Sequence, residues 1–76
     1  MKLLKGDVGR LCLVKWDDIG RVESMLLEIS NDRKYKEAKV FDFNSRVIHN
    51  IEWSQVVEKN GYVTPNSLLA SRHERA

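Results

Sequence analysis

The sequence has few of the residues that would fix a small fold by crosslinking. Of its 76 residues, one is cysteine, one is proline and four are glycine. A single cysteine excludes an internal disulfide, and its place in the apolar run Leu11-Cys12-Leu13-Val14 predicts a small buried hydrophobic residue rather than a reactive thiol. The cysteine count also favours a reducing, intracellular compartment.

Long apolar segments are missing as well. Met1-Lys2-Leu3-Leu4-Lys5 places only two apolar residues between its lysines, too few for the core of a signal peptide. No apolar run is long enough to cross a bilayer. We therefore expect a cytoplasmic protein without a membrane partner. The formal net charge of +2 is too small to indicate nucleic-acid binding by itself.

What the sequence does contain is period-two alternation in short segments, which predicts antiparallel strands. The expected strands span residues 8–16, 21–30, 35–43 and 46–53, with a short last strand at 62–63. Asn60-Gly61 is typical of a tight turn before that last strand. Ser54-Gln55-Val56-Val57 suits a single helical turn with Ser54 as its N-cap. These elements form one domain over residues 1–63, and residues 64–76 are expected to be a tail or short helix.

The segment 21–30 allows two interpretations. Its apolar block Met25-Leu26-Leu27 is too apolar for a strand with one face in water, and good helix formers between Val22 and Ile29 allow a helix instead. Gly20 and Asn31 at the two ends favour a strand between turns. A long, bent strand that serves both halves of a barrel would explain the block. We predict the strand and keep the helix as the alternative.

The expected elements follow one another in an order that resembles a known group of proteins. The motifs are Lys5-Gly6-Asp7-Val8, Trp16, Gly20-Arg21-Val22, Lys39-Val40-Phe41, Ile51-Glu52-Trp53 and Ser54-Gln55-Val56-Val57. They resemble the small SH3-like barrel proteins of tailed bacteriophages, including phages of marine bacteria, whose function is mostly unassigned. The fold class we predict is all-β, a small five-stranded SH3-like barrel with a single helical turn before the last strand and a short C-terminal tail. The resemblance implies a fold and a source, and no activity.

No catalytic, metal-binding or cofactor motif accompanies this pattern. Cys12, His49 and Asp42 could act as nucleophile, base and orienting group only if the fold gathered them. Cys12, His49, His73 and the Asp17-Asp18 pair lack the spacing of a metal site. We therefore predict a non-enzymatic protein without cofactor or metal, and the alternative is an oligomeric enzyme with a shared pore.

Two kinds of binding surface are predicted. An SH3-like barrel presents an aromatic-lined groove between its first long loop and its helical turn, and Trp16, Trp53 and Tyr62 are the candidates for it. Trp53 is equally consistent with the core, whereas Trp16, beside two aspartates, is expected to be partly exposed. Apolar groups on both faces of 47–51 and 25–27 would leave one set in water, which favours a protein partner or a homo-oligomer.

The alternative function is nucleic-acid binding, in which aromatic side chains and basic groups hold a single strand. The basic candidates are Arg33, Lys34, Lys36, Arg72 and Arg75. Acidic residues among the basic ones along the middle of the chain are more typical of an ordinary solvated surface, so protein binding is the leading prediction.

Overall fold

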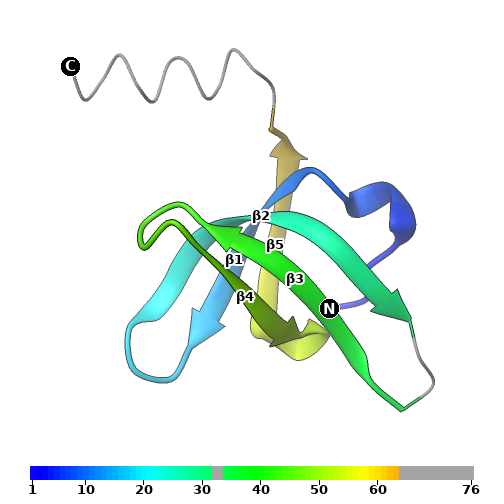
Figure 1. The fold of residues 1–76 in the computed structure, drawn as a ribbon, viewed down its shortest axis with the longest axis horizontal. Coiled ribbons are helices and arrows are strands. Elements are labelled where there is room, and N and C mark those ends of the chain that lie inside the picture. The colour runs from blue at the N-terminus through cyan, green and yellow to red at the C-terminus, as the bar shows by residue number, and fades with distance from the viewer. Residues whose placement is uncertain (32–33, 64–76) are drawn as a thin grey trace.

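The computed structural model describes residues 1–31 and 34–63 of the chain. It contains one antiparallel sheet of five strands: β1 (Arg10–Trp16), β2 (Gly20–Asn31), β3 (Lys36–Asp42), β4 (Val47–Glu52) and β5 (Val56–Tyr62). Two 3₁₀ turns complete the fold, η1 (Lys5–Asp7) and η2 (Trp53–Gln55). The strand order is β4-β3-β2-β1-β5, so η2 carries the chain from one edge of the sheet to the other (Figure 1).

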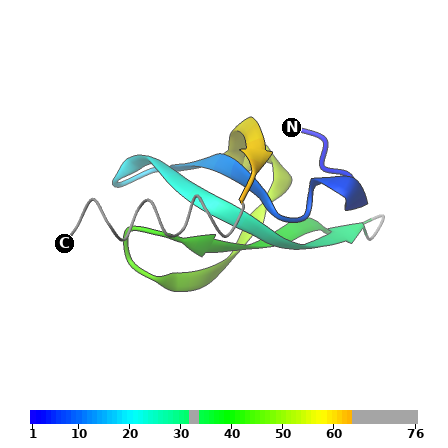
Figure 2. The same cartoon turned by 90° about the horizontal axis from the view of Figure 1, so that it is seen from above.

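The sheet is strongly curved, and its two ends enclose the space between them. Figure 2 shows β5 on one side and the β3–β4 hairpin on the other. This strand order, with a 3₁₀ turn before the last strand, makes the protein an all-β, five-stranded SH3-like barrel, as the sequence predicts. The predicted tail at 64–76 lies outside the described residues. In the described part of the chain, no helix has the length and apolar character that crossing a membrane would require.

The long strand β2 resolves the segment that allowed two interpretations. A helix over 22–29 is wrong, because β2 pairs with β1 through residues 20–25 and with β3 through residues 24–31. The register with β3 shifts between Leu26 and Glu28, which leaves Leu27 as the extra residue of a β-bulge. The bulge explains three apolar residues in a row: Leu26 is fully buried, while Met25 and Leu27 on either side of it are half-buried.

The core lies inside the curled sheet. It consists of Leu3, Cys12, Val14, Leu26, Ala38, Val40, Ile51, Trp53 and Val56. Cys12 is fully buried, as predicted, and Trp16 packs against the cluster while remaining partly exposed, also as predicted. Every strand contributes at least one core residue, because alternate side chains of each strand point to the same face.

The prediction of a turn at Asn60-Gly61 is wrong. Both residues lie inside β5, which is seven residues long. Arg10 of β1 pairs with Tyr62, but Cys12 pairs with Lys59, so Asn60 and Gly61 together face one residue of β1. The Asn-Gly dipeptide therefore marks a β-bulge rather than a chain reversal, because both features need backbone that is not committed to a regular ladder.

The predicted helical turn before the last strand is present, but it starts one residue early. η2 begins at Trp53, with Glu52 as its N-cap, so Ser54 lies inside the turn and is not the cap. The Glu52 backbone N–H donates a hydrogen bond to Oε1 of Gln55 at 3.0 Å. This is the contact that a side chain at the third position of a capping box makes with the backbone of the N-cap residue.

Candidate binding surfaces

An apolar row crosses the outer face of the sheet. Leu11 of β1 faces Met25 of β2, Met25 faces Phe41 of β3, and Phe41 faces Ile48 of β4. Residues directly opposite one another in antiparallel strands share a face, and this is the face turned away from the core. Ile48 is 59% exposed, and the other three residues are half-buried. We call these four residues the outer apolar row.

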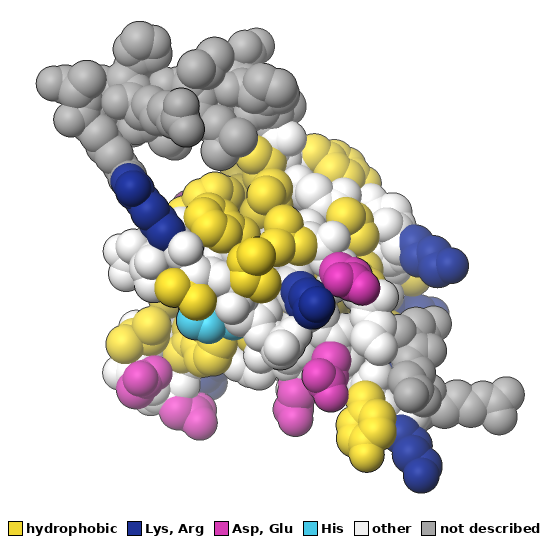
Figure 3. All heavy atoms as spheres, viewed as in Figure 1, with side chains coloured by type: hydrophobic (Ala, Val, Ile, Leu, Met, Phe, Trp, Pro, Cys, Tyr) yellow, Lys and Arg dark blue, Asp and Glu magenta, His cyan; other side chains and the backbone are white. Residues whose placement is uncertain are grey.

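The outer apolar row has apolar support on one side and charged neighbours on the other. Figure 3 shows hydrophobic side chains gathered on the face turned to the viewer. Phe43 packs edge-on against Phe41, with ring centroids 5.4 Å apart. On the other side, Lys39 of β3 and Glu28 of β2 form an exposed ion pair at 3.8 Å. An apolar strip with a polar rim has the composition of surfaces that bind other proteins.

The two edges of the sheet differ in regularity. β4 pairs with β3 in an unbroken register from Val47 to Glu52. β5 shifts its register against β1 twice, once at Asn60-Gly61 and once at Val57. Bulges of this kind twist an edge away from a potential partner strand. Of the two edges, β4 is therefore the one with a regular backbone.

A shallow hollow beside η2 brings together aromatic and charged side chains. Its volume is about 410 Å³, and its lining residues are Lys34, Tyr35, Lys36, Glu37, Glu52, Trp53 and Ser54. Trp53 is only 7% exposed, and its Nε1–H donates a hydrogen bond to the carbonyl oxygen of Glu37 at 3.0 Å. Tyr35 stands exposed, and Nζ of Lys36 lies 5.5 Å from the centroid of the Trp53 ring. Trp53 thus belongs to the core and forms the floor of the hollow.

The three aromatic residues predicted for a shared groove do not all lie together. Trp16 ends β1, whereas Tyr62 pairs with Arg10 at the start of β1. A strand of this length separates them by roughly 20 Å. Trp53 lines the hollow beside η2, and neither Trp16 nor Tyr62 is among the lining residues of that hollow. Among the predicted aromatic residues, Trp53 alone lines this hollow.

Trp16 contacts a polar cluster at the β3–β4 turn. Its ring meets the ring of His49 edge-on at 5.0 Å, and Nε2 of His49 lies 3.4 Å from Oδ2 of Asp42. The backbone N–H groups of Asn44 and Ser45 donate to Oδ1 of Asp42 at 2.8 and 3.2 Å. Burial raises the pKa of Asp42, but these hydrogen bonds outweigh burial and hold the pKa below its ordinary value. The cluster fixes the turn.

The surroundings of Cys12 do not favour a catalytic nucleophile. Cys12 is fully buried, and burial, followed by the nearby charge of Asp7, raises the pKa of its thiol. A protonated, enclosed thiol is a poor nucleophile. Within residues 1–31 and 34–63, no three His, Cys, Asp or Glu side chains gather as metal ligands would.

A buried carboxylate at the opposite end of β1 was not identified from the sequence. Asp7 of η1 accepts hydrogen bonds from the Leu4 backbone N–H at 2.8 Å and from Nζ of Lys59 at 2.9 Å, and Nε of Arg10 lies 3.0 Å from its other oxygen. Burial raises the pKa of Asp7, but the hydrogen bonds and the two cations outweigh burial and lower the pKa. The sequence around Asp7 does not reveal a partner 52 residues away, and only the fold shows that β5 supplies Lys59.

Tyr62 belongs to the same end of the barrel. The Arg10 guanidinium lies 4.6 Å from the centroid of its ring, and its hydroxyl donates a hydrogen bond to the Gly6 carbonyl oxygen. The side chain remains 52% exposed. Tyr62 therefore holds η1 against β5, which accounts for its position without a partner.

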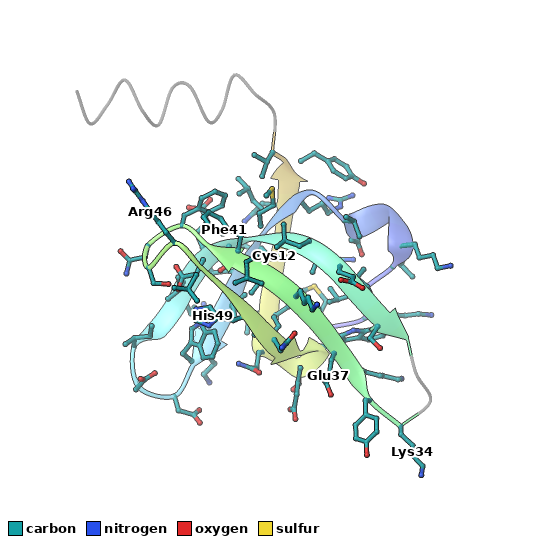
Figure 4. All side chains as sticks on the ribbon, in the orientation of Figure 1. Cys12, Lys34, Glu37, Phe41, Arg46 and His49 are labelled. Carbon is teal, nitrogen blue, oxygen red and sulfur yellow. The ribbon has the colours of Figure 1, made fainter. Side chains whose placement is uncertain are left out.

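The basic residues predicted for nucleic-acid binding divide between the hollow and segments outside the described residues. Lys34 and Lys36 line the hollow, together with the carboxylates of Glu37 and Glu52. Arg33, Arg72 and Arg75 are not among the described residues. In Figure 4, Lys34 and Arg46 lie at opposite ends of the β3–β4 hairpin. The two described candidates, Lys34 and Lys36, thus share their hollow with carboxylates.

Comparison with models of protein families, with curated proteins and with solved structures gave no match.

Proposed function

We propose that this chain is a small non-catalytic binding module that holds a protein partner against its outer apolar row. The observation that carries the proposal is the row itself, which crosses four strands and ends in the exposed side chain of Ile48. Fully burying a large aliphatic or aromatic side chain contributes roughly 1.5–3 kcal/mol relative to leaving it in water. A partner with an apolar strip and polar rim would recover part of that free energy at each residue of the row.

The rim indicates the chemistry of that partner. Beside the row, Lys39 and Glu28 present charges of both signs, and Glu23 stands exposed opposite Leu13 on the same face. A surface of mixed sign favours a protein with complementary charges over a uniformly charged polymer. The partner is therefore expected to be a folded protein or an amphipathic segment rather than a polyanion.

The proposal extends to source and compartment. The order of motifs from Lys5 to Val57 resembles the small SH3-like proteins of tailed bacteriophages, and we propose that the chain is phage-related and works in the cytoplasm of the host cell. The free thiol of Cys12 is compatible with a reducing compartment.

Affinity capture from lysate of the native host tests the proposal. Met25→Lys places a charge in the middle of the outer apolar row, and Asn60→Lys adds the same charge at an exposed position of β5. We expect the wild-type chain and Asn60→Lys to retain the same protein, and Met25→Lys to lose it by about tenfold or more. Circular dichroism of each variant confirms that the sheet is intact. Equal capture by all three chains would show that the row is not the binding surface.

The hollow beside η2 favours nucleic-acid binding as a second candidate function. Lys36 over the ring of Trp53, next to the exposed Tyr35, resembles the aromatic and basic arrangements that hold single-stranded bases. The carboxylates of Glu37 and Glu52 in the same hollow oppose phosphate, which makes this the second choice. Binding of single-stranded DNA that weakens steeply with salt and is lost in Lys36→Glu would support it. Unchanged DNA mobility at low salt would remove it.

A further inference from the structure

We propose that β4 is a pairing edge for a second copy of this chain, and that two curled sheets join through antiparallel β4–β4 contact about a two-fold axis. The contact goes beyond the binding function proposed above, because it uses the backbone edge of β4 rather than the outer apolar row. The occupant is a second copy because β4, when reversed, repeats its own side-chain pattern, and because a cation, Arg46, precedes its first residue while an anion, Glu52, is its last.

The backbone of β4 provides the groups that such a contact needs. β4 is the terminal strand of the sheet and, among residues 1–31 and 34–63, pairs only with β3. In an antiparallel ladder, alternate residues direct their N–H and C=O groups away from the partner strand. One side of β4 therefore presents hydrogen-bond donors and acceptors that only water or another strand can satisfy.

The side chains of β4 do not oppose pairing. From Val47 to Ile51 the strand has no Lys, Arg, Asp, Glu or Pro, and Val47 and Ile48 are 49% and 59% exposed. Edge strands that must stay single are usually protected by lysine, proline or a bulge. β5, at the other edge, has two bulges. The protein protects one edge and leaves the other regular.

Charge selects the register of the two strands. A two-fold axis perpendicular to the sheet keeps outward residues opposite outward residues, so the side-chain alternation is preserved. When His49 faces its own copy, Val47 faces Ile51 of the second copy. Arg46 lies in the turn just before β4, with a φ of 61°, and this register brings it beside the end of the second copy's β4, where Glu52 is the last residue. Both ends of the contact then join opposite charges. Arg46 projects away from the β3–β4 hairpin in Figure 4, where a neighbouring molecule can reach it.

The same register brings the two outer apolar rows together. Ile48 faces Asn50 of the second copy, so the two Ile48 side chains are diagonal neighbours on the outer face, within reach of one another. Each row continues inward through Phe41 and Met25. The dimer thus presents one apolar surface twice as long as that of a single chain, which gives the binding module a second, identical contact for a symmetric partner.

Light scattering and amide hydrogen exchange test the contact on the intact chain. Between about 10 µM and about 1 mM, we expect the mass to rise from 8.8 kDa towards twice that value. Over the same range, alternate amides of β4 are expected to become protected, while those of β5 keep their exchange rates. A strict monomer with concentration-independent exchange overturns the proposal. A dimer without protection of β4 also overturns it, because the copies then meet through another part of the surface.

A charge swap tests the register. Arg46→Glu alone and Glu52→Arg alone are each expected to weaken dimerisation by about tenfold, because each places like charges at both ends of the contact. The double variant Arg46→Glu/Glu52→Arg is expected to restore the wild-type affinity to within about threefold. Ile48→Lys should abolish the dimer, and Asn60→Lys should leave it unchanged. A double variant as weak as the single variants would rule out this register.

The two proposals fail separately. Met25→Lys acts on the outer apolar row and leaves the edge of β4 untouched, so it is expected to lose the host partner and keep the dimer. Arg46→Glu is expected to weaken the dimer by about tenfold and to keep the host partner on each single chain. A monomeric wild-type chain that still loses its partner through Met25→Lys would leave the binding function standing and remove the dimer.

Discussion

Lys59 and Asp7, 52 residues apart in the chain, form a partly buried ion pair at 2.9 Å that ties η1 to β5. Nζ of Lys59 also donates to the Lys2 carbonyl oxygen at 3.3 Å. Because Leu3, between these contacts, is a core residue, the pair holds the N-terminal segment against the open end of the barrel. In a domain of this size, which has little core to spare, one such contact is a large share of the net stability.

Replacing Asp7 with asparagine is expected to lower the free energy of unfolding by about 1–3 kcal/mol, because the partly buried charges of Lys59 and Arg10 would lose the carboxylate that pairs with them. The size and shape of the side chain are retained, so packing is not the cause of the loss. Urea unfolding measures the change. Glu23→Gln, at an exposed position of β2, is the control and should stay within about 0.5 kcal/mol of wild type. An equal effect of the two variants would contradict the proposed role of the pair.

Stability is expected to fall in acid through Asp7 and Asp42. Both have pKa values lowered from the ordinary 3.8 in the folded protein. A group with a lower pKa in the folded state contributes stability that is fully present above its unfolded pKa and is lost as pH falls through its folded pKa. The free energy of unfolding should therefore be level near neutral pH and decline below about pH 4.

Urea unfolding at a series of pH values, with Asp7→Asn and Asp42→Asn beside the wild type, separates the two contributions. Each variant should show a shallower acid slope, because one group no longer binds a proton on unfolding. An unchanged slope in Asp42→Asn would mean that the turn hydrogen bonds do not favour its charged form.

Two glycines should respond differently to alanine. Gly9 has a φ of 95°, and an added Cβ would sit at an ordinary contact distance of 3.6 Å from Cδ1 of Tyr62. Gly9→Ala is therefore expected to cost about 1–2 kcal/mol through backbone strain rather than through a clash. Gly61 has open space around it, and Gly61→Ala should range from no change to about 1 kcal/mol of added stability. Thermal unfolding compares them, and equal losses would contradict the assignment of strain to Gly9.

Cys12 is expected to resist thiol reagents in the native protein. The side chain is fully buried, and burial raises the pKa of its thiol, so both access and thiolate formation are unfavourable. Labelling with a disulfide reagent at neutral pH should be slow in buffer and rapid in denaturing urea. Rapid labelling of the folded chain would show that β1 opens easily.

Much of the barrel could be predicted because alternation and turn residues act locally. In the strand expected at 35–43, alternation puts Ala38 and Val40 on one face and Phe41 on the other, and the structure buries the first two and leaves Phe41 half-buried. The long strand over 21–30 was also predicted, because Gly20 and Asn31 favoured a strand over the alternative helix, and the structure pairs this strand on both sides.

The remaining features depend on contacts that no local pattern contains. Asn60-Gly61 was interpreted as a turn, but the same dipeptide suits a bulge equally well. Only the register against Arg10 and Cys12 distinguishes the two. The outer apolar row requires knowledge of which residue of each strand faces which. The bulge at Leu27 breaks the simple alternation that would have given that register.

The sequence predicted exposed apolar side chains, but it did not predict which residues lie together on the surface. Exposed apolar residues on two strands were expected, and the structure shows Ile48 exposed and Met25 half-buried. The three aromatic residues chosen for a groove have separate surroundings instead: Trp53 forms the floor of a hollow and Tyr62 braces η1. Side-chain type alone does not distinguish an aromatic that binds a ligand from one that supports a turn.

The irregularity of β5 limits how far molecules of this kind can polymerise. A small sheet with two regular edge strands could pair with neighbouring molecules at both edges and grow into a fibre. Here β5 has a bulge at Val57 and another at Asn60-Gly61, so a strand that paired with this edge would lose its register within a few residues. Association through the regular edge of β4 would therefore stop at two chains, and a high protein concentration is not expected to produce fibres.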